Sequence, residues 1–184
     1  MSELHPIIAA DTLRNVCGQW ATGVAIVTGQ GPDGAPLGMA VNSFTSLSLD
    51  PPLVLFCPAL TSTTWPGIRA TGRFAVNILA AAQSELARSF ARSGGPKFDD
   101  VELDPVPDGL PALRGSIARL LCDIEEVHPG GDHEIVVGRV IHTSQTEDPP
   151  LLFHRGQTST LSSVRPTWPA SSQRLMSLLS GLGG

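Results

Sequence analysis

A run of small polar side chains occupies residues 42–48, where the chain reads Asn-Ser-Phe-Thr-Ser-Leu-Ser. Apolar segments with strand character flank this run, at residues 37–41 and 53–57. Its hydroxyl and amide groups supply many hydrogen-bond donors and acceptors with little bulk. A flat, polar-edged heterocycle with a phosphate tail needs such a surface, but a polar strand edge or loop has the same composition. Composition alone leaves both interpretations open.

A second polar run, Ser62-Thr63-Thr64, directly precedes a predicted short helix over residues 64–70. Serine and threonine are common N-caps, because their hydroxyls accept hydrogen bonds from the first free N–H groups of a helix. The same N–H groups, together with hydroxyls, also form sites for phosphate. Both roles are compatible here, because one hydroxyl can cap the helix while the others face a ligand.

Three cations lie close together at Arg88, Arg92 and Lys97, with Phe90 and Phe98 among them. A solvated helix face has this pattern. So does a site in which cations pair with a phosphate and aromatic rings pack against a planar ligand.

Two other patterns suggest chemistry that the sequence does not support. Gly29, Gly31 and Gly34 spell Gly-x-Gly-x-x-Gly, but Pro32-Asp33-Gly34 predicts a hairpin instead of the helix that a dinucleotide fingerprint requires. His128 and His133 flank a predicted hairpin tip without a third metal ligand at a suitable spacing, so no metal site is predicted. The sequence also contains no Gly-x-Ser-x-Gly, Walker A or His-Glu-x-x-His motif.

Strands dominate the predicted elements, and the helices are too few to alternate with them. We therefore expect a mainly β protein, an antiparallel barrel or sandwich with a few short helices. Asp11 or Thr12 is predicted to cap the first helix, which Gly23 ends, and residues 93–115 form a long loop. Strands are predicted at residues 24–28, 37–41, 53–57, 74–79, 118–124, 135–141 and 151–154, and further helices at 64–70 and 82–92.

Size and charge exclude several functional classes. With 184 residues and 41% hydrophobic residues, the chain suffices for one domain with a real core. A net charge of −5 without a basic run argues against nucleic acid and anionic membranes. Cys17, Cys57 and Cys122 are too far apart for a disulfide framework or a zinc motif. Without a signal-peptide pattern or an apolar run of about 18 residues, a cytoplasmic protein is expected.

Taken together, these stretches resemble the short-chain flavin reductases, the NAD(P)H-dependent partners of two-component flavin monooxygenases. The likeness covers about residues 10–157. The specific pair is Asn42-Ser-Phe-Thr-Ser46 with Asp50-Pro-Pro52. Supporting stretches are Trp20-Ala-Thr-Gly-Val24, Arg73-Phe-Ala-Val-Asn-Ile-Leu79, Lys97-Phe98, Gly131-Asp-His133 and Phe153-His-Arg-Gly156.

The resemblance implies a split-barrel, Greek-key antiparallel fold and a homodimer with sites near the subunit interface. It also implies hydride transfer from NADH, in preference to NADPH, to FAD or FMN. The reduced flavin would then reach a partner monooxygenase by diffusion. Residues 1–161 would form the flavin reductase domain, and residues 162–184 a tail with a possible short helix.

Site residues also follow from the resemblance. Residues 39–46 would line the flavin ring, Cys57 and residues 62–64 would hold the ribityl and phosphate end, and His133 would lie near the nicotinamide. No acid, base or nucleophile is obligatory, because the cofactors carry the chemistry. The full set is Met39, Ala40, Val41, Asn42, Ser43, Ser46, Cys57, Ser62, Thr63, Thr64, Asn77, Ser89, Phe90, Ala91, Arg92, Lys97, Phe98, His133 and Phe153.

One departure from the family supports a second hypothesis. The family often has tyrosines near its closing strand, whereas this chain has none and carries Phe153, His154 and Gln157-Thr158 there. A non-catalytic flavin-binding or carrier protein on the same fold therefore remains an alternative. A pyridoxamine-phosphate-type oxidase is disfavoured, since a single lysine and scattered arginines give little to bind a second phosphate.

Overall fold

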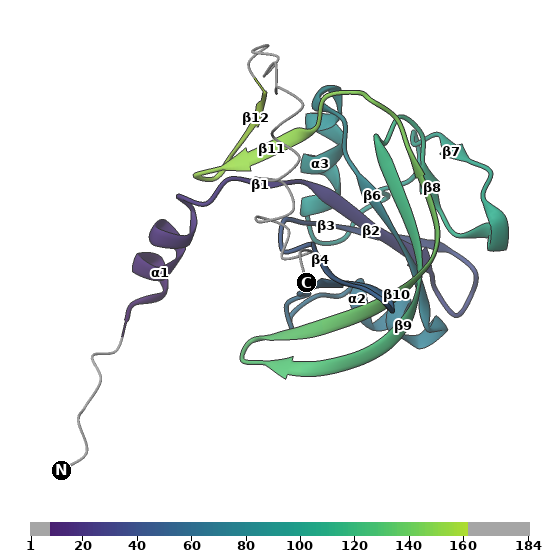
Figure 1. Ribbon diagram of the computed structural model, residues 1–184, viewed down its shortest axis with the longest axis horizontal. Helices are drawn as coiled ribbons and strands as arrows, with labels where there is room; N and C mark the ends of the chain where they lie inside the picture. The colour runs from purple at the N-terminus through teal and green to yellow at the C-terminus, as the bar shows by residue number, and fades with distance from the viewer. Residues whose placement is uncertain (1–7, 162–184) are drawn as a thin grey trace.

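The structure is a computed structural model that describes residues 8–161 (Figure 1). The predicted C-terminal tail from residue 162 lies outside the described residues. Within residues 8–161 there are three α-helices, all short, namely α1 (Ala10–Cys17), α2 (Trp65–Thr71) and α3 (Ser84–Ala91). None of the helices in this range has the length and apolar character needed to span a membrane.

A seven-stranded antiparallel sheet forms the body of the molecule, in the order β3-β2-β6-β9-β10-β5-β4. Its strands are β2 (Ala25–Gln30), β3 (Pro36–Val41), β4 (Thr45–Leu49), β5 (Pro52–Phe56), β6 (Arg73–Ile78), β9 (Ala118–Gly130) and β10 (His133–Gln145). The predicted class, mainly β and antiparallel with a few short helices, is confirmed.

The sheet curves strongly around the main apolar core. Phe56 of β5 packs against Phe74 of β6 with ring centroids 5.2 Å apart, although β9 and β10 separate these strands in the sheet. Both rings are fully buried, and Trp65 of α2 meets Phe56 edge-on at 5.4 Å. A flat sheet could not bring strands at this separation into ring contact, since neighbouring strands lie about 4.8 Å apart.

A smaller three-stranded sheet and helix α1 form an arm that extends from the body (Figure 1). Its strands are β1 (Thr22–Gly23), β11 (Leu151–His154) and β12 (Gln157–Thr160). Helix α1 buries none of its residues, and Leu13, Val16 and Trp20 are 55%, 65% and 78% exposed. The arm therefore presents apolar side chains that nothing within residues 8–161 covers.

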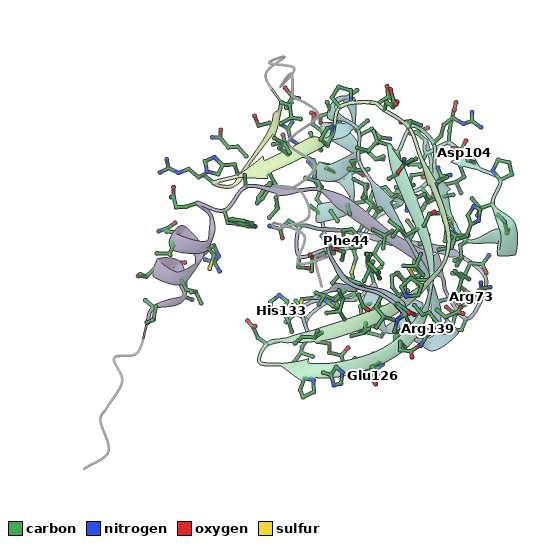
Figure 2. All side chains as sticks on the ribbon, in the orientation of Figure 1. Phe44, Arg73, Asp104, Glu126, His133 and Arg139 are labelled. Atoms are coloured by element: carbon green, nitrogen blue, oxygen red, sulfur yellow. The ribbon has the colours of Figure 1, made fainter. Side chains whose placement is uncertain are left out.

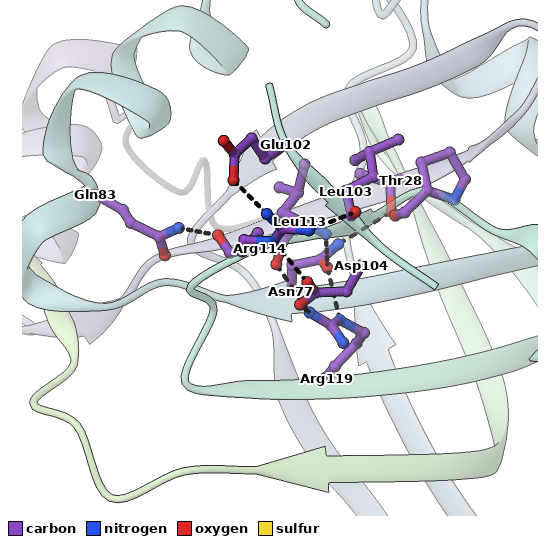
Figure 3. A network of polar contacts seen from close by, with 10 residues as sticks. Thr28, Asn77, Gln83, Glu102, Leu103, Asp104, Leu113, Arg114 and Arg119 are labelled. Carbon is purple, nitrogen blue, oxygen red and sulfur yellow. Dashed lines mark hydrogen bonds and ion pairs between the residues drawn. The ribbon is translucent and has the colours of Figure 1, made fainter. Parts of the chain in front are cut away.

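The predicted long loop contains a short hairpin held by a polar network (Figure 3). Strand β7 (Leu103–Asp104) pairs with β8 (Ala112–Leu113), and the 3₁₀ turn η2 (Pro107–Gly109) lies between them. A second 3₁₀ turn, η1 (Ala81–Gln83), directly precedes α3. Asp104 accepts hydrogen bonds from Arg114 Nε at 2.9 Å and Arg119 Nη2 at 3.0 Å. These two guanidinium groups lower the pKa of Asp104, Arg114 having the larger effect.

Several predicted boundaries need correction. Helix α1 ends at Cys17 and is followed by Gly18, so Gly23 does not end it. Asp11 lies inside the helix, bonded to Arg14, instead of capping it. Strand β10 is longer than predicted because its pairing with β9 continues through exposed polar residues. Strand β12 was not predicted, because Gln157-Thr-Ser-Thr160 lacks the apolar alternation that marks a strand.

The Gly-x-Gly-x-x-Gly segment forms the predicted hairpin between β2 and β3. Gly34 has a φ of 79°, a conformation that glycine adopts without strain. Its N–H donates to the Gly31 carbonyl at 2.9 Å, and the Asp33 side chain accepts from Ala35 N–H at 3.1 Å. The chain therefore turns into β3 at the point where a dinucleotide fold would begin a helix.

Candidate functional site

A groove of about 680 Å³ lies where four separate parts of the chain meet. The end of β3 and the following residues form one wall, and the segment 57–64 between β5 and α2 forms another. The end of α3 with residues 92–97 and the tip of the β9–β10 hairpin complete it. Polar groups from distant parts of the sequence thus face one open space.

Phe44 explains how the first wall displays its polar groups. The Phe44 ring packs against the main core, while Asn42 on the other side of Ser43 stays exposed. Ser43 Oγ accepts a hydrogen bond of 2.9 Å from the Cys57 N–H, which joins the end of β3 to the end of β5. Burial raises the pKa of the Cys57 thiol, so this group lines the groove as a neutral side chain.

The run before α2 divides its hydroxyls between two roles. Ser62 Oγ accepts hydrogen bonds from the N–H groups of Thr64, at 3.3 Å, and Trp65, at 3.1 Å, and so caps the start of α2. Thr63 and Thr61 are exposed and line the groove. One hydroxyl therefore serves the helix while its neighbours face the open space, as the sequence allowed.

Lys97 ties the end of α3 to β3. Its Nζ donates to the carbonyl oxygens of Gly38 and Phe90, both at 3.2 Å. A glycine is required at position 38, because a Cβ there would collide with the Phe90 ring. Burial lowers the pKa of Lys97, which is half-buried beneath the groove. An ammonium has three donors, so one N–H remains for a ligand.

Arg92 is the second cation that lines the groove, and its hydrogen bonding differs from that of Lys97. Its side chain is exposed, and within residues 8–161 it forms no hydrogen bond or ion pair through its guanidinium. A guanidinium in this state can make paired hydrogen bonds to a phosphate without first breaking an ion pair.

His133 occupies the tip of the β9–β10 hairpin, as Figure 2 shows. Its ring Nδ1 lies 2.7 Å from Asp132 Oδ1, and the contact lowers the pKa of the Asp132 carboxyl. A carboxylate only accepts hydrogen bonds, so Nδ1 carries the proton in this contact and Nε2 is available as an acceptor or a second donor. The side chain is 43% exposed and lines the groove.

Most of the residues singled out in the sequence meet in this groove. They are Met39, Ala40, Val41, Asn42, Ser43, Cys57, Ser62, Thr63, Thr64, Phe90, Ala91, Arg92, Lys97 and His133. Ser46 lies on β4 and Ser89 on the exposed side of α3, and neither lines the groove.

Asn77 must be corrected, because it belongs to the core and not to the groove. It is completely buried. Its Nδ2 donates to Thr28 Oγ1 at 3.0 Å, and its Oδ1 accepts the Leu113 N–H at 2.9 Å (Figure 3). The same Nδ2 also donates to the Ile26 carbonyl at 3.1 Å. Its amide is therefore occupied in joining β6 to β2 and β8.

Phe98 and Phe153 line recesses next to the groove. Phe98 lies in a recess of about 370 Å³ that shares Thr63, Thr64 and Lys97 with the groove. Phe153 of β11 lines a recess of about 550 Å³ that shares residues 40–42 and Ala91 with it. These recesses extend the groove in two directions.

Sequence reasoning missed six residues that line the groove, namely Pro58, Ala59, Thr61, Ser93, Gly130 and Ile135. Thr61 begins the Thr-Ser-Thr-Thr run, so extending that run by one residue could have found it. Pro58 and Ile135 carry no polar signal and are placed only by the fold.

Comparison with known proteins agrees with this geometry. The sequence pattern of the flavin reductase-like domain matches residues 17–162. The chain belongs to the flavin reductase family. The reductase subunit HsaB of a flavin-dependent monooxygenase from Rhodococcus jostii is 47% identical over 145 residues, which span 78% of this chain and 74% of that protein.

Two further members of the family are similar over most of their length. The NADH-dependent FMN reductase SmoA of Agrobacterium fabrum is 41% identical over 145 residues, spanning 79% of this chain and 82% of that protein. The structure of a Streptomyces globisporus NADH:FAD oxidoreductase in complex with NAD and FAD fragments superposes with a TM-score of 0.80 at 35% identity. That match covers 88% of this chain and 99% of the other.

Proposed function

We propose that this chain is a flavin reductase that oxidises NADH, reduces FAD or FMN, and supplies the reduced flavin to a partner monooxygenase. The observation that carries the proposal is the single groove in which residues 39–43, the hydroxyls of residues 61–64, two cations and His133 meet. Relatives named as reductase subunits of monooxygenases support the same activity. NADH and a partner oxygenase are both expected in the cytoplasm, where we place the protein.

The flavin ring lies along the wall formed by residues 39–43 in this proposal. Met39 and Ala40 supply apolar contact, and Asn42 presents an amide to the polar edge of the ring. Flat aromatic rings bind best where apolar contact and a few polar groups combine. Ser46 lies on β4, outside the residues that line the groove.

The phosphate end of the flavin lies toward Thr63, Thr64, Arg92 and Lys97. These side chains line one end of the groove and offer hydroxyl and cationic donors. No carboxylate of the described residues lines the groove itself, although Asp99 lines the adjoining recess with Thr63, Thr64 and Lys97. The donor set therefore fits a phosphate, with Arg92 as its most accessible cation.

The nicotinamide lies near His133. When both cofactors are bound, the nicotinamide donates a hydride to the flavin ring, a chemistry that needs no protein nucleophile. The residues of the groove therefore act by binding and alignment, with the reacting atoms about 3–3.5 Å apart. His133 orients the nicotinamide through its ring, which Asp132 holds in one tautomer.

The curved sheet completes a split barrel and the protein is a homodimer in this proposal, with residues 1–161 as one domain. The exposed apolar side chains of α1 support the dimer, because isolated surface helices rarely leave such residues uncovered. A groove of about 900 Å³ between the arm and the body reaches Asn42 and Ser43, so a second subunit seated there would border the flavin site.

Initial rates with all four combinations of FAD or FMN and NADH or NADPH test the proposal. The purified protein is expected to consume NADH with at least one flavin, and to use NADPH less well. No nicotinamide oxidation above the protein-free rate in any of the four combinations would reject it.

A flavin carrier on the same fold is the second candidate. Phe153 and Thr158 pair across β11 and β12, where the family often has tyrosines, and this altered strand pair favours it. Replacing His133 by alanine separates the two. A reductase is expected to show a higher KM for NADH, whereas a carrier binds flavin with unchanged affinity and oxidises no NADH before or after the change.

A further inference from the structure

Glu134 directly follows His133 on β10, yet it belongs to the opposite side of the strand. Successive side chains of a strand point to opposite faces. His133 therefore lines the groove, while Glu134 meets helix α2. The Glu134 side chain is only 18% exposed, and within residues 8–161 it forms two strong polar contacts, both with that helix.

Both carboxylate oxygens of Glu134 are occupied. Trp65 donates its indole N–H to Oε2 at 2.5 Å, and Arg69 donates from Nη1 to Oε1 at 2.6 Å. The two donors lie four residues apart and so share one face of α2. Trp65 is 3% exposed and its ring meets Phe56 in the core. The carboxylate thus fixes the first turns of α2 against β10.

The backbone makes a second connection between the same two parts of the chain. Glu134 N–H donates to the Pro58 carbonyl, and Leu60 N–H donates to the Asp132 carbonyl, both at 2.9 Å. Ala59 and His133 pair between these bonds as an isolated antiparallel bridge. Residues 58–60 are therefore held against the hairpin tip.

These contacts close a ring around residues 61–64. The segment leaves the hairpin tip at Leu60 and returns to the same strand at Trp65 through Glu134. Residues 61–64, which all carry hydroxyls and line the groove, lie on the span between the two attachments. Without the Glu134 carboxylate, the Trp65 end of the span would lose both polar contacts with β10 and keep apolar packing such as that of Trp65 against Phe56.

We propose that Glu134 is a positioning residue that sets the spacing between His133 and residues 61–64. The inference rests on the proposed function, in which these two parts bind the nicotinamide and the flavin phosphate. Hydride transfer depends steeply on the relative placement of the two rings, since a misplacement of about 1 Å can cost about 100-fold in rate. In this proposal the Glu134 carboxylate touches neither ligand. It affects the reaction by holding together the two segments that bind them.

A matched control lies on the same hairpin. Glu125 of β9 accepts hydrogen bonds from Arg139 Nε at 2.8 Å and Nη2 at 2.5 Å, so it also forms a two-oxygen contact with arginine. Neither of these residues lines the groove, and Figure 2 places Arg139 well along the hairpin from His133. Loss of this pair is expected to leave ligand spacing unaffected.

The experiment compares Glu134→Gln with Glu125→Gln. Glutamine keeps the shape of the side chain, but an NH2 donor replaces one of the two oxygens, so either Trp65 or Arg69 faces another donor at its present position. For Glu134→Gln we expect kcat/KM to fall about tenfold with each ligand varied, and the visible spectrum of bound flavin to change. Glu125→Gln is expected to stay within about twofold of the wild type, with both melting temperatures close to each other.

Arg69→Gln serves if Glu134→Gln does not fold, because the Arg69 side chain is 51% exposed and outside the core. It is expected to lower kcat/KM in the same direction. Where Glu134→Gln does fold, adding Arg69→Gln to it should cause no further loss. Wild-type activity with unchanged kinetics and spectrum in Glu134→Gln overturns the inference. Equal losses in the Glu134 and Glu125 variants do so as well. A wild-type protein that reduces no flavin rejects the proposed function, and the inference with it.

Discussion

Two polar clusters of this molecule contain similar side chains but differ in whether these side chains bond to one another. The network around Asn77 joins amide, hydroxyl, carboxylate and guanidinium groups, and they satisfy one another (Figure 3). The groove also carries amide, hydroxyl and guanidinium groups, yet within residues 8–161 the side chains of Asn42, Thr63 and Arg92 form no hydrogen bond or ion pair. A cluster that satisfies itself holds the fold together, whereas one left open to solvent has donors to offer a ligand.

The largest effect is expected from Asn77→Ala. The change leaves the Leu113 N–H without its acceptor inside the core, and the free energy of unfolding should fall by about 3 kcal/mol. Chemical denaturation measures the loss. Flavin affinity of the folded fraction is expected to stay unchanged, and a weaker affinity at equal stability would return Asn77 to the binding site.

Arg92→Gln should have the opposite profile. The KM for FMN is expected to rise about tenfold, which corresponds to about 1.4 kcal/mol for a lost charge-assisted contact with phosphate, while the melting temperature stays the same. Riboflavin, which lacks the phosphate, provides the control, because its KM should not respond. Equal responses with FMN and riboflavin would contradict the assigned phosphate end.

A smaller effect is expected from pH at Asp104. Arg114 and Arg119 hold the pKa of this carboxyl below its ordinary value of 3.8. Its contribution to stability is therefore fully present above that value and is lost as pH falls through the lowered folded pKa. The melting temperature of Asp104→Asn should consequently approach that of the wild type as the pH drops below about 4. A difference that stays constant from pH 7 to pH 2.5 would exclude this linkage.

Thr63→Val is expected to have the smallest effect. It removes one exposed hydroxyl from the groove and nothing from the core, so the KM for FMN should rise by about threefold. Steady-state rates at varied FMN concentration measure it, with Thr71→Val as a control that removes a hydroxyl at the far end of α2. An equal rise in both variants would point to a general effect of the helix.

The sequence predicts what short-range patterns encode. Asp33-Gly34 marks a hairpin because glycine accepts the turn conformation, and the polar run after β3 marks the wall of the groove. Asn77 shows the limit, since its acceptor role for Leu113 depends on a residue 36 positions away. Glu134 is similar, because its indole donor lies 69 positions earlier in the chain. Contacts of this kind exist only after folding.

Lys97 is the single lysine of the chain, and its amine lies beneath the groove, held by two carbonyl oxygens. An amine-selective reagent therefore meets one side-chain target in the whole sequence, and bound flavin would shield it. Protection of this one amine would count occupied sites directly, without a coloured ligand or a coupled assay. Because the sequence has one lysine, the extent of its modification would report the fraction of flavin sites that are occupied.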